Sequence, residues 1–185
     1  MITKDYQDQK GGKILILSDS HGDVTTLIDI VAFWQKAIDV VLFLGDGAEE
    51  LLEVAYIFVE LPFFAVTGNN DAVIAPNSRV NFPLEQKLTL FGHCFYLTHG
   101  HIAPYAAVKA EVLTRAKKAS ASVALYGHLH IPEVYIDDNM RRFNPGSIAY
   151  PRGNSEPSYL ILTINQDYLE YQFFNAKSHQ KIEGM

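Results

Sequence analysis

The feature that most constrains the fold is a short apolar run, Ile14–Leu17, which ends abruptly in the polar stretch Ser18–Asp23. An unbroken apolar run of this length, closed by polar residues and glycine, is typical of a strand buried on both faces. Asp19 and His21 stand two apart at its carboxyl end. In an extended segment such residues point the same way, so a carboxylate and an imidazole are expected to face one point. That pair can hold a divalent metal ion at the edge where an α/β sheet usually places its site.

Composition places the chain among ordinary globular proteins. Its 185 residues, 48% hydrophobic and 19% charged, predict one domain over 1–185, with 1–12 and about 176–185 loose. The net charge of −6 argues against non-specific binding to nucleic acid or to an anionic membrane. The lone Cys94 excludes an internal disulfide. We also find no apolar run of membrane-spanning length and no signal-peptide core, so we expect the protein in the cytoplasm.

The first half of the chain alternates between predicted strands and helices. Helices are expected over Val24–Lys36 and Ala48–Val59, and buried strands over Val40–Leu44 and Pro62–Val66. Together with the first strand they give the order β-α-β-α-β. This order predicts a parallel sheet with helices on its faces.

The second half is less regular. Residues 72–83 contain two prolines and show no period, which indicates a loop. A helix is predicted from Pro104 to about Lys118, because proline suits the first helical turn, and a buried strand is predicted over Val123–Tyr126. Three hairpins are predicted, from Gln86–Leu90 with Cys94–Thr98, Val134–Ile136 with Met140–Phe143, and Tyr159–Ile164 with Tyr168–Phe174.

Side chains that can bind metal recur where the predicted strands end. They are Asp19, His21, Asp46, Asn69, His99, His128 and His130. Each motif alone is compatible with a plain turn, a helix cap or a polar residue in the core, but their joint occurrence favours a metal site. Carboxylate, imidazole and amide ligands suit borderline divalent metals such as Mn²⁺, Fe²⁺, Zn²⁺ or Co²⁺. A structural zinc site built on thiolates is excluded by the single cysteine.

These motifs carry a family resemblance over about Ile14 to Arg152. They are Asp19-x-His21, Gly45-Asp46, Gly68-Asn69-x-Asp71, His99-Gly100-His101 and Gly127-His128-Leu129-His130. The set resembles the calcineurin-like metallophosphoesterases. The short chain, with Asn144-Pro145-Gly146-Ser147 after the last histidines, resembles their small phosphodiesterase branch, to which the retromer scaffold subunit also belongs. The resemblance implies an α/β fold, a four-layer α/β/β/α sandwich with mixed sheets.

The resemblance also implies a cofactor and a reaction. One metal ion would be held by Asp19, His21 and His130, and a second by Asn69, His99 and His128. Asp46 would bridge the two, because a carboxylate has one oxygen for each. The ions would be divalent, Mn²⁺ before Fe²⁺, Zn²⁺, Ni²⁺ or Co²⁺. The implied activity is that of a metal-dependent phosphoric ester hydrolase, most of all a phosphodiesterase, in which a metal-bridging hydroxide attacks a small phosphodiester in line.

One position departs from the family pattern. Many members have histidine after the motif asparagine, where it can protonate the leaving group, but this chain has Asn70, which cannot act as an acid. We therefore assign His101 as the candidate acid, with a structural role as its alternative. Asp71 is assigned to orienting a ligand, with capping of a turn as its alternative. Asn144 and Arg152 are candidate contacts to the substrate phosphate.

Three other functions compete with this hypothesis. A non-catalytic scaffold on the same fold predicts eroded ligands, and none is substituted here. A nuclease would need a channel for a long polymer. A phosphomonoesterase would be favoured by basic groups around the metals, for which Arg152, Arg79 and the pair Arg141-Arg142 are the candidates. We expect no stable contact with nucleic acid or membrane, and a homo-oligomer stays open, with Tyr105 and Tyr135 as candidate interface residues.

Overall fold

The fold is described by a computed structural model, which covers residues 6, 9–71, 82–137, 140–165 and 168–184. Two five-stranded sheets face each other, with strand orders β10-β9-β1-β2-β3 and β4-β5-β6-β8-β7. The elements of the first sheet and its helices are β1 (Gly11–Leu17), α1 (Val24–Trp34), β2 (Val40–Phe43), α2 (Ala48–Ile57), β3 (Phe63–Ala65), β9 (Ser158–Asn165) and β10 (Tyr168–Asn175). Those of the second are β4 (Glu85–Leu90), β5 (His93–Thr98), η1 (Tyr105–Ala107), α3 (Val108–Lys118), β6 (Val123–Tyr126), β7 (Glu133–Ile136) and β8 (Arg141–Asn144).

Both sheets are mixed. In the first, β1, β2 and β3 run parallel, as the β-α-β-α-β order predicted, and β9 and β10 add an antiparallel hairpin to β1. In the second, β5, β6 and β8 run parallel, and β4 and β7 close the edges in the antiparallel direction. The three predicted hairpins are confirmed by these pairings.

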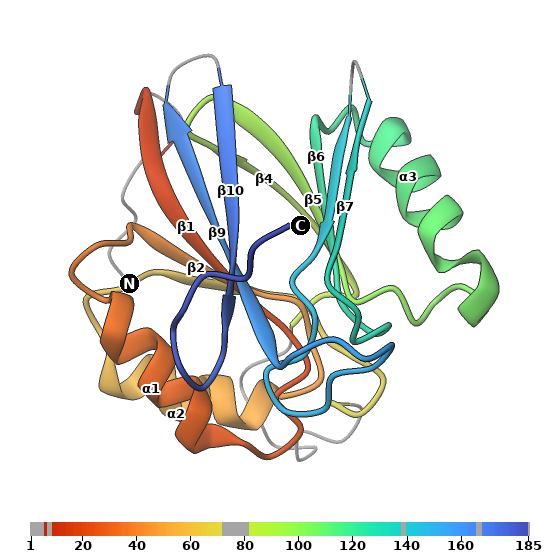
Figure 1. The fold of residues 1–185 in the computed structure, drawn as a ribbon. Coiled ribbons are helices and arrows are strands. Elements are labelled where there is room, and N and C mark those ends of the chain that lie inside the picture. The colour runs from red at the N-terminus through yellow and green to blue at the C-terminus, as the bar shows by residue number, and fades with distance from the viewer. Residues whose placement is uncertain (1–5, 7–8, 72–81, 138–139, 166–167, 185) are drawn as a thin grey trace.

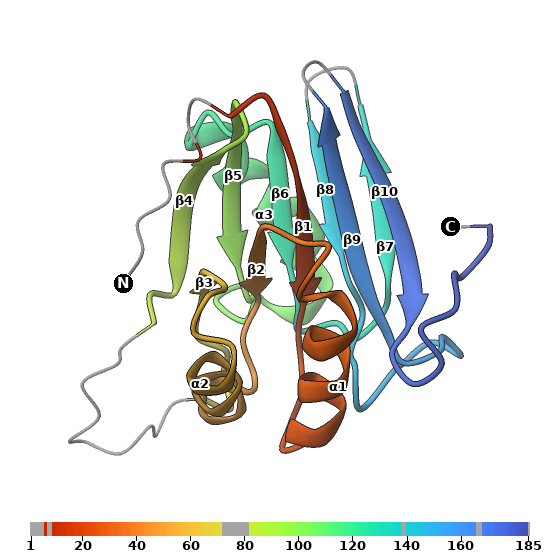
Figure 2. The same ribbon diagram turned by 90° about the vertical axis from the view of Figure 1, so that its left-hand side faces the viewer.

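The predicted position of the helices was wrong in one respect. We expected helices on the faces of one parallel sheet, but α1 and α2 cover only the outer face of the first sheet, and α3 covers the outer face of the second (Figures 1 and 2). The inner faces pack on each other around a shared apolar core. The expected four-layer α/β/β/α sandwich is confirmed, and its second sheet occupies the face that helices would have covered.

Alternation along β1 explains how one strand serves two cores. Ile14 and Ile16 point between the sheets, whereas Leu15 and Leu17 point towards the helices, and all four are fully buried. The prediction of a strand buried on both faces is confirmed. The run is continuously apolar because β1 belongs to a sheet that packs against the other sheet on one face and against α1 and α2 on the other.

The ends of the described chain are less loose than predicted. The Ile182 amide donates to Phe173 O at 2.9 Å, and the Ile182 side chain packs against the core between the sheets. Tyr6 is buried, and its hydroxyl donates to Asp39 O at 2.9 Å. The predicted loop lies mostly outside the described residues, as does Arg79. Pro104 precedes a short 3₁₀ turn, and α3 itself begins at Val108.

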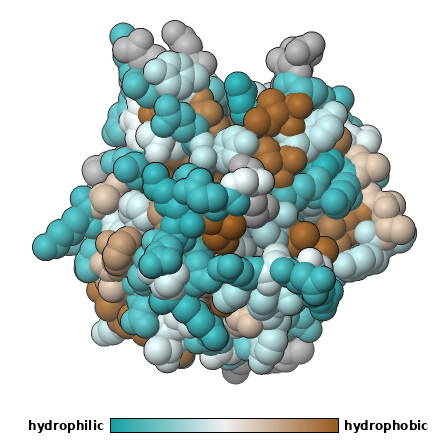
Figure 3. All heavy atoms as spheres, viewed as in Figure 1, coloured by the Kyte–Doolittle hydropathy of each residue, from teal (hydrophilic) through white to brown (hydrophobic). Residues whose placement is uncertain are grey.

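The surface agrees with the composition. On the face shown in Figure 3, hydrophobic residues form separate patches between hydrophilic ones. Among the helices of the described chain, none combines the length and apolar character needed to cross a lipid bilayer.

The two sheets meet at one edge. The loops after β1 and β2 are joined by the Asp19 amide, which donates to Gly45 O at 3.0 Å. Those after β5 and β6 are joined by the Gly127 amide, which donates to His99 O at 3.2 Å. The first pair of loops contacts the second where the His128 amide donates to Asp19 Oδ2 at 3.1 Å. Strand ends from both sheets are thus brought to the same place.

Candidate metal centre

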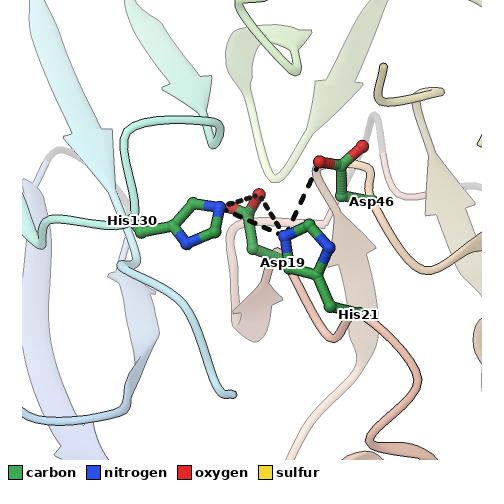
Figure 4. Close-up of side chains that lie close together, drawn as sticks. All are labelled: Asp19, His21, Asp46 and His130. Carbon is green, nitrogen blue, oxygen red and sulfur yellow. Dashed lines mark hydrogen bonds and ion pairs between the residues drawn. The ribbon is translucent and has the colours of Figure 1, made fainter. Parts of the chain in front are cut away.

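Four predicted ligands form one compact cluster at this edge. Asp19, His21, Asp46 and His130 each offer a ligand atom, and these atoms all lie within 4.8 Å of one another (Figure 4). His130 Nε2 is 3.1 Å from Asp19 Oδ1 and 3.2 Å from His21 Nε2. His21 Nε2 is in turn 3.7 Å from Asp46 Oδ2. The residues that the family resemblance assigned to one metal ion and to the bridge are the members of this cluster.

The remaining three predicted ligands adjoin the cluster through His99. Its Nε2 lies 3.4 Å from Asp46 Oδ2 and 3.2 Å from Asn69 Oδ1. The His128 ring packs edge-on against the His99 ring, with centroids 5.1 Å apart. The structure therefore gathers the other six predicted ligands around Asp46, and Asp46 touches both groups, as the predicted bridging role requires.

Backbone carbonyls set the tautomers of two of these histidines. His130 Nδ1 is 2.7 Å from Tyr150 O, and His99 Nδ1 is 2.7 Å from Leu44 O. A carbonyl oxygen only accepts hydrogen bonds, so Nδ1 carries the hydrogen in both rings. In its neutral form, each ring would then present the Nε2 lone pair to the cluster, which is the arrangement found in metal-binding histidines.

Asp19 supplies the sharpest test of whether a cation fits. Its Oδ2 accepts from Ser18 Oγ at 2.6 Å and from the His128 amide. Its Oδ1 is buried and has no hydrogen-bond partner among the described residues, although it faces the lone pair of His130. An unpaired buried carboxylate oxygen is costly, and two facing acceptors repel each other. A divalent cation between them removes both costs, so the donor set fits a metal ion.

The charges of the cluster act on its histidines. Burial lowers the pKa of His99, but the hydrogen bond to Asp46 and the charges of Asp19 and Asp46 outweigh it, so the pKa lies above its ordinary value. Burial raises the pKa of the Asp46 carboxyl, but His99 and Asn70 hold it well below its usual range. A proton on His99 and a metal ion are two ways to neutralise the same carboxylates.

The backbone at the site is strained. Five predicted ligands have left-handed backbone angles, with φ of 57° at Asp19, 43° at His21, 58° at Asp46, 65° at His128 and 58° at His130. Such angles are uncommon outside glycine, cost about 1–3 kcal/mol each and gather at functional sites. The backbone at Gly68 also lies very close to the Asp46 side chain, since a Cβ at this position would be 2.0 Å from Asp46 Oδ1. Gly68 therefore makes room for the carboxylate of Asp46, the predicted bridging ligand.

Asp71 and Asn70 hold this carboxylate in place. Asp71 accepts from the amides of Asp46 at 2.8 Å, Gly47 at 2.7 Å, Ala48 at 3.0 Å and Gly68 at 2.7 Å. Asn70 donates to Asp46 from its amide nitrogen at 2.8 Å and from Nδ2 at 2.6 Å. The contacts of Asp71 fit its alternative role of securing the turns around Asp46. The sequence indicated only that Asn70 cannot act as an acid. Its two hydrogen bonds orient Asp46, the predicted bridging ligand.

Several predicted phosphate contacts are placed elsewhere. Asn144 is buried, donates to Gly127 O at 2.8 Å and accepts from the Gly146 amide at 2.9 Å, so its side chain is committed to the backbone. Arg142 is buried beneath α3, where it pairs with Glu133 and donates to Lys109 O. Arg141 opens β8, at the end of the strand away from the site. Arg152 is exposed, and its amide donates to His130 O at 3.0 Å, next to the cluster.

His101 lies beside the second group of ligands. Its ring centroid is 5.4 Å from that of His99, and its Nδ1 is buried with no partner among the described residues. Burial and the neighbouring His99 lower the pKa of His101, so the neutral ring is favoured. The assignment of His101 as the acid stays a prediction.

Four supporting groups were missed by the sequence reasoning. They are Ser18, the carbonyls of Leu44 and Tyr150, and Ser147, whose hydroxyl donates to Asp19 O at 2.8 Å. Ser147 and the two carbonyls carry no local signal, because they act on residues distant in the chain or through the backbone. Ser18 acts on the adjacent Asp19, but a serine at the end of a strand does not by itself indicate this role.

The family is established by comparison with known proteins. The model of the calcineurin-like phosphoesterase superfamily domain matches residues 13–167, and the chain belongs to this superfamily. The probable metallophosphoesterase YsnB of Bacillus subtilis (strain 168) is 30% identical over 167 residues, 90% of this chain and 93% of YsnB. The phosphodiesterase YfcE of Escherichia coli (strain K12) is 27% identical over 188 residues, covering 90% of this chain and 94% of YfcE. These relatives identify the protein as a phosphoesterase.

Solved structures agree in fold. A conserved protein of Streptococcus pneumoniae TIGR4, described as a predicted phosphoesterase, matches with a TM-score of 0.78 and 27% identity over 95% of each chain. The Zn²⁺ complex of wild-type Vps29 from Entamoeba histolytica matches with a TM-score of 0.72 and 19% identity over 92% of this chain and 96% of Vps29. At that identity, the likeness to Vps29 concerns the fold alone.

Asp71→Asn tests the anchoring of the site. An amide at this position turns an NH₂ group towards two of the four backbone amides, so we expect unfolding to become about 2–3 kcal/mol easier and Mn²⁺ to bind more weakly. Thermal unfolding and calorimetric titration with Mn²⁺ measure the two effects. Asp29→Asn, at an exposed position on α1, is the matched control. Wild-type Mn²⁺ affinity in Asp71→Asn would show that the turns around Asp46 hold without this carboxylate.

Proposed function

We propose that the protein is a phosphodiesterase that acts with two divalent metal ions, of which Mn²⁺ is the first candidate. The observation that carries the proposal is the convergence of Asp19 Oδ1, Asp46 Oδ2 and the Nε2 atoms of His99 and His130, in which the buried Asp19 Oδ1 has no hydrogen-bond partner among the described residues. Family membership supplies the reaction class. The name of YfcE, a phosphodiesterase, supports the substrate class.

Some residues of this site would hold the metal ions, and others position the residues that do. Asp19, His21 and His130 would hold one ion, Asn69, His99 and His128 the other, and Asp46 would be shared. Bound there, the ions would supply an acidified water as nucleophile and positive charge for the phosphoryl oxygens. Asn70 and Asp71 keep Asp46 between the two groups, and the carbonyls of Leu44 and Tyr150 keep the ring nitrogens aimed inwards.

The charge of the adjoining pocket supports a diester over a monoester. A pocket of about 260 Å³ beside the cluster is lined by His21, Gly22, Asp46, Gly47, Glu49, Glu50, Asn70 and Asp71. Its described lining contains acidic residues and no lysine or arginine. A phosphomonoester carries close to two negative charges at neutral pH and a diester only one, so the monoester meets the stronger repulsion.

Two features of the setting are part of the proposal. The acidic net charge supports a small phosphodiester rather than a nucleic acid as the substrate. The single cysteine supports a reducing compartment, the cytoplasm.

Hydrolysis of bis(4-nitrophenyl) phosphate by metal-stripped protein tests the function. We expect turnover to require added Mn²⁺ and to fall at least about a hundredfold in His99→Ala, because the loss of one ligand weakens the site. His179→Ala, remote from the cluster, is the matched control. Full activity in His99→Ala would contradict the assignment. A wild-type protein that binds Mn²⁺ but hydrolyses no phosphate ester would favour the scaffold on this fold.

Glu49→Gln tests the charge of the pocket. Glu49 is exposed in the first turn of α2, and its removal weakens the repulsion of a second negative charge. We expect kcat/KM for 4-nitrophenyl phosphate to rise about two- to fivefold relative to bis(4-nitrophenyl) phosphate, less so at high salt. Glu53→Gln, on the same helix outside the pocket lining, is the control. An unchanged ratio would mean that Glu49 takes no part in selecting the substrate.

A further inference from the structure

Two exposed tyrosines stand against the histidines of the metal centre. The Tyr150 ring contacts the His21 ring edge-on, with centroids 5.6 Å apart, and 61% of Tyr150 is exposed. The Tyr105 ring contacts the His128 ring edge-on, with centroids 6.0 Å apart, and 55% of Tyr105 is exposed. Each tyrosine ring therefore borders the site through one edge-on contact, and much of its own surface stays exposed.

Neither tyrosine is explained by the stability of the fold. Neither belongs to the three apolar core clusters, and neither hydroxyl makes a hydrogen bond to a described residue. The buried tyrosines differ in this respect, since Tyr126 and Tyr159 each have a hydrogen-bond partner for the hydroxyl. An aromatic ring that is left open beside a reactive centre offers a surface on which another ring can stack.

The two tyrosines belong to different halves of the centre. Tyr150 borders His21, a member of the four-residue cluster, whereas Tyr105 borders His128, which adjoins His99. A phosphodiester carries two ester groups, and the two tyrosines border the two halves of the centre. Ile102 and Ile131, which directly follow His101 and His130 in the chain, are each 36% exposed.

The two tyrosine rings do not line the acidic pocket. Its described lining includes Glu49 and Glu50 but neither Tyr105 nor Tyr150. The surroundings of the centre thus combine a wall that repels additional negative charge with a rim that attracts flat apolar groups. A substrate that satisfies both has a single charge on phosphorus and an aromatic ring on an ester group.

We infer that Tyr105 and Tyr150 form a stacking rim that selects phosphodiesters whose ester groups carry a planar aromatic ring, either an aryl group or the base of a nucleoside. The inference rests on the proposed phosphodiesterase function and names the substrate class of the same site. Tyr150→Ala or Tyr105→Ala weakens the binding of ring-bearing ligands and leaves ligands without a ring unaffected. Tyr150→Phe keeps the ring and keeps the binding.

Binding of two phosphinates tests the rim without any turnover. Diphenylphosphinate and dimethylphosphinate carry one negative charge and cannot be hydrolysed, because carbon replaces both ester oxygens. In calorimetric titrations of the Mn²⁺-loaded protein, we expect Tyr150→Ala to weaken diphenylphosphinate about two- to tenfold and to leave dimethylphosphinate unchanged. The same is expected of Tyr105→Ala. Tyr168→Ala, an exposed tyrosine on β10, is the control.

Kinetics then distinguish the two sources of the ring. Thymidine 5′-(4-nitrophenyl phosphate) and methyl 4-nitrophenyl phosphate share one leaving group, so a KM effect of Tyr150→Ala or Tyr105→Ala confined to the thymidine ester identifies a nucleoside ester group. An effect on both esters together, with diphenylphosphinate binding also weakened, identifies the aryl group that the two esters share.

Two outcomes would overturn the inference. Equal weakening of both phosphinates, together with weaker binding of Mn²⁺ alone, would mean that the tyrosines only support His21 and His128. Unchanged binding of both phosphinates in the alanine variants would mean that the rim contacts no ligand. Failure of the proposed function looks different, because the wild-type protein would then hydrolyse neither nitrophenyl ester, whatever the phosphinates do.

Discussion

The facing lone pairs of Asp19 Oδ1 and His130 Nε2, held 3.1 Å apart, are the constraint around which the site is built. Neither atom has a hydrogen to share when the histidine is neutral, and Asp19 Oδ1 is cut off from water. Such a pair is unfavourable until a cation lies between its members. The left-handed backbone at Asp19 and His130 adds to the cost. The fold must therefore impose this arrangement, and metal binding recovers part of what it costs.

The sandwich imposes it through two cores that share one strand. Ile14 and Ile16 fix β1 to the second sheet, and Leu15 and Leu17 fix it to α1 and α2, so the strand end that carries Asp19 has little freedom. The contributions from the second sheet, His99 and His130, arrive on strands packed against the same core. The predicted ligands from both sheets are in this way anchored to one packed core.

The sequence predicted most of the elements, and it predicted every residue of the four-residue cluster, because apolar runs that end in Asp or His are local signals. It did not predict that the parallel sheet would have helices on one face only, since nothing in a buried strand reveals what buries it. Asn144 shows a second limit of the sequence, because a side-chain amide that hydrogen-bonds the backbone cannot be distinguished in sequence from one that binds phosphate. Tyr150 shows a third limit. Its carbonyl contacts His130 and its ring contacts His21, and these two histidines lie 109 positions apart in the chain. These roles depend on contacts that only the folded chain creates.

Anomalous diffraction from crystals grown with Mn²⁺ would show whether two metal ions bind around Asp46. We expect two anomalous peaks in the wild-type protein, on either side of Asp46. One should lie beside Asp19, His21 and His130, and the other beside Asn69, His99 and His128. In Asp46→Asn, both peaks should weaken, because the shared ligand loses its charge. The absence of any peak among these residues at millimolar Mn²⁺, or a single peak that does not weaken in Asp46→Asn, would rule out a two-metal site bridged by Asp46.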